Sequence, residues 1–433
     1  MGADIILPKL NYNFYISFKT FYILACFILF YSYLNAQISN LDSLQIIQTN
    51  SKDLKKKLHL SGYGVMNLNC YNWQLFPAKR NDIDFERAVL ELNYQIDDQW
   101  KLVSELEIEH GGTGVTLEFD PLEEFGEFEY EVEKGGEIWL EQFNIRYHFN
   151  TDVNVSFGRV KVPFGLSNFF DEPDEYRTNQ LPEMENVILP TNWTEYGILL
   201  NGIFRKHLHW YLGVVAGLDG SAFNSANFIK RGNQRRFETV NAEDIAGVIR
   251  LDYKFNDNNH LGISGYFGNT RNNRPKPDLQ QNAFLALFEA HTALKWNLFS
   301  VQIISLFGQL QNSEAVSNAN RNLSNNLNVK RTPVGKQAFG ASLEFGFQVS
   351  ELIKKGMKNK LFMFGRYDYY DTQFATEGSI FNNPRWERNA IAFGFNYLPT
   401  HWLILKGQYS KQIIGIAVNK YQETMSLGFG FIL

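Results

Sequence analysis

Hydrophobic and polar residues alternate along most of the chain that follows residue 57. In "ETMSLGFGFIL", residues 423–433, large apolar side chains take turns with glycine and hydroxyl residues. Successive side chains of a strand point to opposite faces, so this segment has one apolar face and one small or polar face. The same pattern recurs in residues 86–96, 101–109 and 338–349. Each segment predicts a strand of about 9 to 11 residues, the length that crosses an outer membrane.

About sixteen such segments follow one another along the chain. Bacterial single-chain barrels have an even number of strands, so the pattern predicts an all-β fold, a transmembrane antiparallel β-barrel of about 16 strands. The segments lie near residues 58–70, 85–96, 100–110, 137–149, 153–162, 194–204, 208–218, 245–255, 260–270, 283–295, 298–310, 338–349, 360–371, 386–397, 401–412 and 421–433.

The connectors between these segments are alternately short and long. The short ones are predicted turns at residues 97–99, 150–152, 256–259, 296–297 and 398–400. The long ones are predicted loops at residues 110–136, 163–193, 219–244, 271–282, 311–337 and 372–385. Short turns at the periplasmic rim and long loops at the other rim are typical of outer-membrane barrels. A soluble β-sandwich or propeller is the alternative, but neither predicts this consistent rhythm.

Closure of the barrel explains how the chain is stabilised in lipid. Hydrocarbon offers no hydrogen bonds, so every backbone N–H and C=O must pair with another strand, and only a sheet without edges allows this. The first strand is therefore expected to pair with the last. In the last strand, Phe429 and Phe431 are expected to face lipid, while Gly428 and Gly430 face the lumen.

The N-terminus has the layout of a secretory signal peptide. Lys9 and Lys19 precede the apolar run "FYILACFILFYSYL", and Ala36 is a small residue at the expected cleavage position. We therefore expect a signal peptide at residues 1–36, a periplasmic segment at 37–57 and the barrel at 58–433. An uncleaved anchor helix is the alternative.

Removal of the signal peptide leaves 39 basic and 45 acidic residues, a net charge of −6. No basic stripe remains that would suit nucleic acid. The mature chain also retains a single cysteine, Cys70, so no disulfide can form within it. Its stability must come from strand pairing.

One long stretch of the sequence indicates a family as well as a fold. The segment "VNVSFGRVKVPFGLSNFFDEPDEYRTNQLPEMENVILPTNWTEYGILLNG", residues 153–202, resembles the phosphate-selective porin (porin O and P) family of Gram-negative outer membranes. "SELEIEHGGTG" and "FNYLPTHWLILKGQYS" are also similar to that family. The resemblance implies a 16-stranded barrel, commonly a homotrimer surrounded by lipid and lipopolysaccharide, with its third external loop folded inward as a constriction.

The residues of that third loop, 163–193, favour the same arrangement. The loop carries the apolar clusters "FGLSNFF" and "NVILP", which need a wall to pack against. An ordinary external flap is the alternative. The charged residues of the predicted constriction loop are Asp171, Glu172, Asp174, Glu175, Arg177, Glu183 and Glu185. Their acidic balance predicts that the loop biases a pore toward cations.

Strand parity selects the residues that would line the pore. By alternation these are Arg87, Lys101, Glu105, Arg146, His148, Arg250, Arg366, Arg388 and Lys406. Arg159 and Lys161 share the parity of Phe157, which would place two cations in lipid. Each would destabilise the folded protein by about 2 to 4 kcal/mol. A β-bulge at Gly158 would turn both inward, and we predict this bulge. The alternative places both cations at the outer rim, near lipid phosphates.

Together these features predict a water-filled porin for passive diffusion of small ions or solutes, including anions such as phosphate. The sequence has no G-x-S-x-G motif, and we expect no catalytic residue, metal site or cofactor. Two other classes stay open, a barrel enzyme embedded in the membrane and a structural or adhesive barrel with a plugged lumen. Conductance across a planar bilayer distinguishes an open pore from both.

Overall fold

Backbone hydrogen bonds between neighbouring strands organise the fold. The computed structural model describes residues 57–119, 130–234, 239–256, 258–323, 331–353, 356–415 and 420–433. The predicted signal peptide and residues 37–56 of the predicted periplasmic segment lie outside these ranges. Residues Lys55–Leu433 group as one compact unit.

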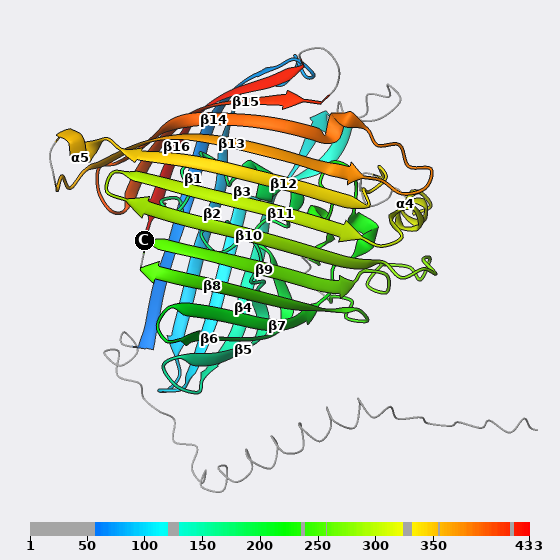
Figure 1. Ribbon diagram of the computed structural model, residues 1–433, viewed down its shortest axis with the longest axis horizontal. Coiled ribbons are helices and arrows are strands. Elements are labelled where there is room, and N and C mark those ends of the chain that lie inside the picture. The colour runs from blue at the N-terminus through cyan, green and yellow to red at the C-terminus, as the bar shows by residue number, and fades with distance from the viewer. Residues whose placement is uncertain are drawn as a thin grey trace, which may run out of the picture. The chain divides into compact units, whose positions relative to one another are not determined.

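Sixteen antiparallel strands form this unit (Figure 1). They are β1 (Leu58–Trp73), β2 (Asp82–Gln95), β3 (Trp100–Phe119), β4 (Tyr130–His148), β5 (Val153–Lys161), β6 (Thr194–Phe204), β7 (Leu208–Ala216), β8 (Ile245–Asn256), β9 (Asn259–Asn269), β10 (Phe284–Trp296), β11 (Phe299–Leu310), β12 (Gln337–Gln348), β13 (Lys360–Ala375), β14 (Glu387–Leu398), β15 (Leu403–Ile414) and β16 (Tyr421–Ile432). The predicted number of strands and their order are confirmed.

The sheet closes on itself between its first and last strands. Each strand pairs with its sequence neighbours, and β1 pairs with β16 in a register that places Asn69 opposite Ser426. The Ser426 hydroxyl donates a hydrogen bond of 2.7 Å to the Asn69 side chain. A closed sheet has no edge strand, which removes the unpaired backbone groups that lipid would not tolerate.

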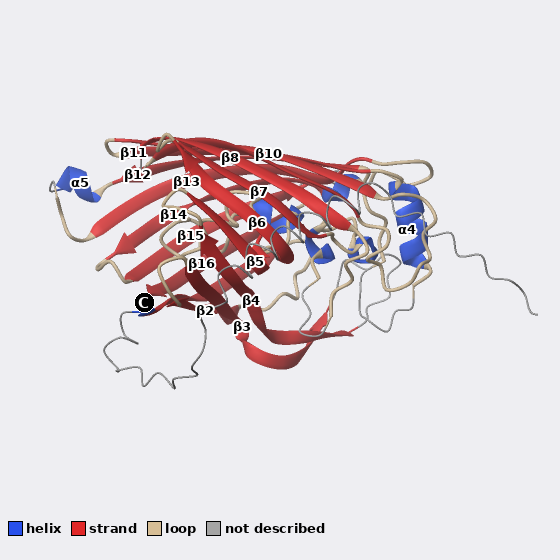
Figure 2. Ribbon diagram, turned by 90° about the horizontal axis from the view of Figure 1, so that it is seen from below, coloured by secondary structure: helices blue, strands red, loops and turns tan. Residues whose placement is uncertain are grey.

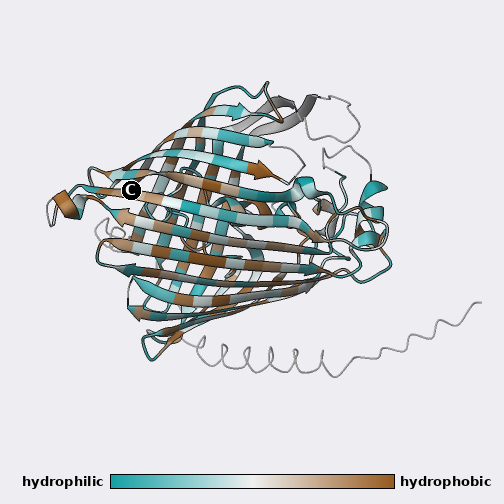
Figure 3. Ribbon diagram, turned by 45° about the horizontal axis from the view of Figure 1, so that its top comes forward, coloured by the Kyte–Doolittle hydropathy of each residue, from teal (hydrophilic) through white to brown (hydrophobic). Residues whose placement is uncertain are grey.

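Alternation along each strand gives the barrel an apolar exterior. In β16, Leu427 is 59% exposed and its neighbour Ser426 only 8%. In β12, Leu343 is 49% exposed and Glu344 only 3%. Figure 3 shows the resulting alternation of hydrophobic and hydrophilic positions along the strands. An apolar surface of this extent is far larger than the patches found on soluble proteins, so this face meets lipid.

Two predicted loops are shorter than expected because their flanking strands are longer. β3 and β4 occupy most of the predicted loop at residues 110–136, and β13 extends to Ala375 in the predicted loop at 372–385. The β3–β4 register shifts between Glu109 and Gly114. Beyond the bilayer both faces of a hairpin meet water, so pairing continues where apolar alternation stops.

The predicted bulge at Gly158 is wrong. The register of β5 runs without a shift through Gly158 in its pairing with both β4 and β6. The extra residue lies in β4 instead, where Glu141 falls between the pairs Glu105↔Gln142 and Leu106↔Leu140. Gly158 has a φ of +124°, a conformation that suits glycine rather than residues with a side chain.

In the described ranges, helices are few and short. They are α3 (Glu183–Ile188), α4 (Ser313–Arg321), α5 (Ser350–Ile353) and the 3₁₀ turns η1 (Gly220–Ala222), η2 (Lys230–Gly232) and η4 (Pro384–Trp386). Figure 2 shows α4 at the rim opposite α5, which lies in the connector between β12 and β13. Among the described residues, no helix is both long and apolar enough to cross a membrane.

The two faces of the barrel should respond differently to an added charge. Replacing Leu427, on the outer face, with Arg is expected to lower the free energy of unfolding by about 2 to 4 kcal/mol, because the guanidinium enters hydrocarbon. Ser410→Arg, on the inward face of β15, is expected to cost less than about 1 kcal/mol. Urea unfolding of the protein folded in lipid vesicles measures both changes. Equal losses would contradict the assignment of the faces.

Candidate functional site

The third loop, residues 163–193, connects β5 to β6 and lies inside the barrel. Its contacts reach strands on several sides of the wall. Gly165 N donates to Ser264 Oγ on β9 at 3.4 Å, Arg177 Nη1 lies 2.9 Å from Glu344 Oε1 on β12, and Asn179 N donates to Gln408 Oε1 on β15 at 2.9 Å. These three contacts tie one loop to well separated strands, so the loop crosses the interior.

An apolar core fills the side of the interior next to β7–β12. On the loop, the core consists of Phe164, Leu166, Met184, Ile188, Leu189 and Trp193, all nearly inaccessible to solvent. On the strands, it includes Val215, Val248, Tyr266, Leu287 and Leu306. Gly340 on β12 makes room for the loop, since a Cβ there would lie 2.6 Å from Met184 Sδ. The apolar clusters of the sequence therefore pack against the inner wall.

Three predicted cations connect the loop to the strands. Arg250 Nε lies 2.8 Å from Asp252 Oδ2, and its Nη1 donates to the Gly165 carbonyl at 2.5 Å. Lys406 Nζ donates to two loop carbonyls, those of Tyr176 at 2.7 Å and Thr178 at 2.9 Å. Arg87 Nη1 donates to Asn192 Oδ1 at 3.1 Å. Since buried charges need partners, these contacts hold the loop in place.

The predicted pair Arg159 and Lys161 separates. Lys161 Nζ reaches into the interior and lies 3.1 Å from Asp171 Oδ2. Arg159 instead occupies a register position opposite Phe143 and Tyr196, both exposed on the outer face. It is only 3% exposed, because its Nε donates to the Glu141 carbonyl and the Thr194 hydroxyl. Arg159 is therefore a residue of the wall rather than of the lumen.

The other predicted lining residues lie at different depths. Arg366 forms ion pairs with Asp368 and Glu344 at mid-barrel. Lys101 and Arg146 face each other near the rim with short turns, and His148 is half-buried there. Arg388 is buried near the opposite rim and donates to the Glu387 carbonyl. Glu105 accepts a hydrogen bond from Gln142 and is buried. They form no single row.

The acidic residues of the loop divide into two groups. Asp171, Glu183 and Glu185 are engaged in holding the loop. Asp171 accepts from Tyr63 Oη at 3.1 Å, Glu183 accepts from Tyr370 Oη at 2.7 Å, and Glu185 accepts from the Leu166 backbone N–H at 2.6 Å. Burial raises the pKa of Glu183 and of Glu185.

The second group consists of Glu172, Asp174 and Glu175. Among the described residues, no cation lies within ion-pair distance of these three carboxylates. Burial raises the pKa of Glu172, and it raises the pKa of Glu175 to about 8, with Asp171, Glu172 and Asp174 adding to the effect. Glu175 is exposed, and the Glu172 backbone N–H, which donates to Glu175 Oε2 at 3.1 Å, opposes the rise in its pKa.

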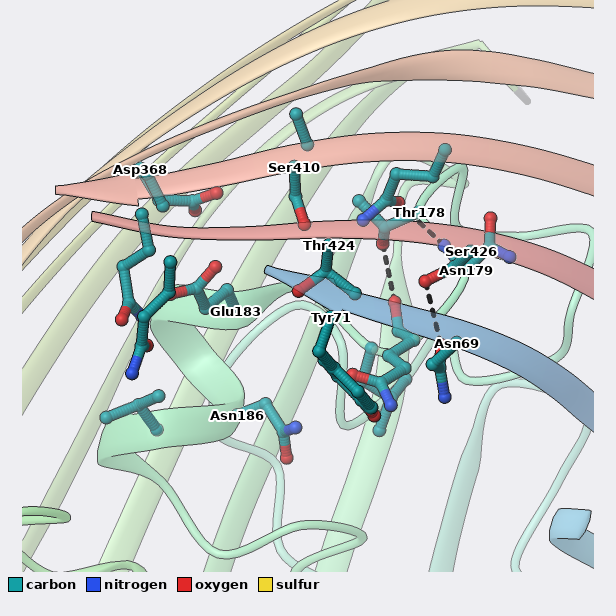
Figure 4. Close-up of a pocket in the computed structure, with 18 of the residues that line it drawn as sticks. Asn69, Tyr71, Thr178, Asn179, Glu183, Asn186, Asp368, Ser410, Thr424 and Ser426 are labelled. Atoms are coloured by element: carbon teal, nitrogen blue, oxygen red, sulfur yellow. Dashed lines mark hydrogen bonds between the residues drawn. The ribbon is translucent and has the colours of Figure 1, made fainter. Parts of the chain in front are cut away.

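A cavity of about 370 Å³ remains between the loop and the strands β13, β14, β15, β16 and β1. We call the part of its lining on β15, β16 and β1 the neutral wall, because none of its residues carries a charge; they are Asn69, Tyr71, Trp73, Gln408, Ser410, Gln412, Gln422, Thr424 and Ser426. β13 adds Asp368 to the lining beside this wall. Figure 4 shows Glu183 and Asn186 on α3 facing Tyr71, Thr424 and Ser410 of this wall. Strand alternation predicts an inward position for each of these residues, but a pore lining predicted from charged positions alone does not include them.

Residues Tyr176–Asn179 of the loop cross the interior below this cavity, toward the rim with short turns. Asn179 Nδ2 donates to Asn67 Oδ1 on β1 at 3.5 Å, while Lys406 holds the Tyr176 and Thr178 carbonyls from β15. Gly428 allows this close approach, since a Cβ there would lie 2.8 Å from Asn179 Nδ2. The glycine row of the last strand thus provides space for the loop.

In the described part of the chain, no three His, Cys, Asp or Glu side chains are grouped so that they could hold a metal ion. The features that define the interior are the inserted loop, its ion pairs and the neutral wall. A closed sixteen-strand barrel with an apolar exterior and a long loop inside has the architecture of an outer-membrane porin.

The comparisons with known proteins identify the family. The model of the family phosphate-selective porin O and P matches residues 69–367, and the chain belongs to this family. An uncharacterized protein of Aquifex aeolicus is 25% identical over 364 residues, which cover 83% of this chain and 76% of that protein.

Solved structures share the fold. The anion-selective porin from Comamonas acidovorans is similar with a TM-score of 0.52 at 11% identity, over 87% of this chain and 99% of that one. The outer membrane channel DcaP of Acinetobacter baumannii has a TM-score of 0.50 at 10% identity, over 87% and 97% of the two chains. The predicted family and barrel class are confirmed, and the protein is a barrel channel of the outer membrane.

Lys406 should control how firmly the loop is held. Lys406→Met leaves the carbonyls of Tyr176 and Thr178 without this donor, a loss of about 1.5 to 3 kcal/mol for a charge-assisted hydrogen bond. The barrel should still fold, because strand pairing is unchanged, but current through the pore should fluctuate more. Lys411→Met, which removes an ion pair to Glu423 at the end of β15, is the control. Equal noise in both variants would argue against this role.

Glu175 should make ion selectivity depend on pH. Its pKa in the folded protein is raised, so it gains its charge only as the pH rises toward about 8, whereas an ordinary carboxyl is ionised above about 4.5. Its contribution to folding is therefore most favourable below pH 4.5 and is lost as the pH rises from there to about 8. Cation preference should increase between pH 6 and pH 9.

Reversal potentials in a KCl gradient measure this change. Glu175→Gln should flatten the dependence, while Glu351→Gln, at the rim with short turns, should leave it intact. A dependence that survives in Glu175→Gln would show that another group titrates.

Proposed function

We propose that the protein is a passive diffusion channel for small ions and solutes, and that the route runs beside the neutral wall. The observation that carries this proposal is the cavity between the third loop and strands β13–β16 and β1. The side of the interior next to β7–β12 is filled by the apolar core, whose residues offer no polar surface comparable to the neutral wall. The third loop then acts as the constriction, and the barrel has no catalytic role.

The charged residues support a weakly selective channel rather than a phosphate-selective one. Phosphate selectivity requires cations whose donors are free to meet the anion. Five of the interior cations, Arg87, Lys161, Arg177, Arg250 and Arg366, each have a carboxylate partner within 3.4 Å. The unpaired loop carboxylates Glu172, Asp174 and Glu175 favour cations instead.

We also propose that residues 1–36 form a cleaved signal peptide, which would deliver the chain to the outer membrane. The positively charged start, the short apolar run and Ala36 support this. A homotrimer surrounded by lipid and lipopolysaccharide is proposed on the resemblance to the family.

A plugged structural barrel is the second candidate. The contacts of Tyr176–Asn179 with Asn67, Lys406 and Gln408 favour it, since they tie the loop across the interior below the cavity. Purified protein in a planar bilayer separates the two. Stable conductance steps in KCl support the channel, and a folded barrel that stays silent supports the plug.

The loop carboxylates should set the sign of selectivity. Changing Glu172 and Glu175 to Gln and Asp174 to Asn removes up to three charges and roughly keeps side-chain volume. Because these groups lie in a narrow space less than about one Debye length, roughly 8 to 10 Å, from passing ions, screening is incomplete. The reversal potential is expected to shift toward anions by several millivolts in a tenfold KCl gradient.

The matched control neutralises an acidic residue outside the lumen. Glu423→Gln, at the end of β16, should leave the reversal potential unchanged. If the triple variant also left it unchanged, the loop would not border the ion route.

A further inference from the structure

We propose that the cavity beside the neutral wall is a binding site for neutral polyhydroxylated solutes, such as mono- or disaccharides. The inference rests on the proposed channel, because solutes reach the cavity by diffusion. The wall offers side-chain amides and hydroxyls from three adjacent strands, β15, β16 and β1, while β14 contributes Ala390 and Ala392 to the cavity and β13 contributes Asp368. Amides and hydroxyls both donate and accept hydrogen bonds, as sugar hydroxyls do.

Two aromatic rings add an apolar surface to this polar lining. The rings of Tyr71 and Trp73 lie on one face of β1 with centroids 5.1 Å apart, at an angle of 75°. Trp73 Nε1 donates to Thr424 Oγ1 at 3.0 Å, which fixes the indole against β16. The C–H face of a sugar ring can pack on such a surface while its hydroxyl groups meet the polar residues.

Three charged residues border the cavity, and each has a partner within the protein. Asp368 is paired with Arg366 at 2.9 Å, and Glu183 accepts hydrogen bonds from Tyr370 and Gln412. Lys79 Nζ lies 5.2 Å from the Tyr71 ring centroid and 5.8 Å from that of Trp73. One cation beside two acidic residues does not suit an anion such as phosphate, which needs several converging donors.

The dimensions agree with a small solute. Cavities that hold small molecules have volumes of about 300 to 1,000 Å³, and this cavity has about 370 Å³. Its lining extends from residues Thr178 and Asn179 to Trp73, Lys79 and Gln422, near the rim with long loops. A solute arriving from that side would meet the neutral wall before it reached the constriction.

Maltose and inorganic phosphate are the probes for the test. Saturation-transfer NMR of the folded protein in detergent reports contact with maltose and its dissociation constant, whether or not the pore conducts. KCl conductance is measured in parallel in planar bilayers. We expect maltose to bind, to reduce the open-channel current, and to be displaced by glucose but not by phosphate at equal concentration.

Two variants and a control make the test specific. Trp73→Ala is expected to weaken maltose binding roughly five- to tenfold through loss of one packing surface. Trp296→Ala removes an aromatic ring exposed at the end of β10 next to a short turn and should leave binding unchanged. Ser410→Arg places a cation on the neutral wall and should weaken maltose binding while it allows phosphate to reduce the current.

The outcomes separate the site from the channel. Maltose contact without conductance steps would keep the site and overturn the channel. Conductance without maltose contact would keep the channel and overturn the site. Tighter binding of phosphate than of maltose to the unmodified protein, or equal binding by Trp73→Ala and Trp296→Ala, would also overturn the site. Unheated gel mobility establishes that each variant is folded.

Discussion

Every backbone hydrogen bond in the membrane must be made within the protein, and the rest of the structure follows from this constraint. It requires a closed sheet, so β1 pairs with β16 and an even number of strands alternates in direction. Closure then divides every strand into an outward row that meets lipid and an inward row that meets water or the third loop. The interior is therefore the one place where polar and charged side chains can gather.

The third loop changes what this interior can do. Its apolar residues turn one side of the lumen into a core, and its polar groups take up many of the inward cations. A buried charge that loses its partner is costly, so these cations are committed to the loop and to neighbouring carboxylates. What remains for a solute is the neutral wall on β15, β16 and β1, together with the unpaired carboxylates of the loop. The family name refers to phosphate, whereas the neutral wall has the chemistry of uncharged hydrogen bonding.

Period-two alternation was sufficient to predict the strands, because lipid on one side and water on the other act on every residue. Their limits deviated mainly where hairpins leave the bilayer, as in β3 and β4, since water on both sides removes the alternation. Arg159 could not be placed from parity, because the extra residue that adjusts the wall is Glu141 on the neighbouring strand. The contacts of the loop, such as that between Lys406 and the Tyr176 carbonyl, join residues far apart in sequence, so local alternation cannot predict them. Alternation also places the residues of the neutral wall on the inward face, but selecting charged residues alone leaves them out of the predicted lining.

The central claim is that the water-accessible route follows the neutral wall, while the opposite side is closed by the loop. Cysteine accessibility tests it most directly, in a Cys70→Ser background, since Cys70 is exposed. A charged, water-soluble thiol reagent should react with Ser410→Cys and Thr424→Cys and reduce the current through the pore. It should not react with Ser264→Cys, which lies on β9 beneath the loop and is only 6% exposed. Rapid reaction at residue 264 with none at 410 and 424 would contradict the account.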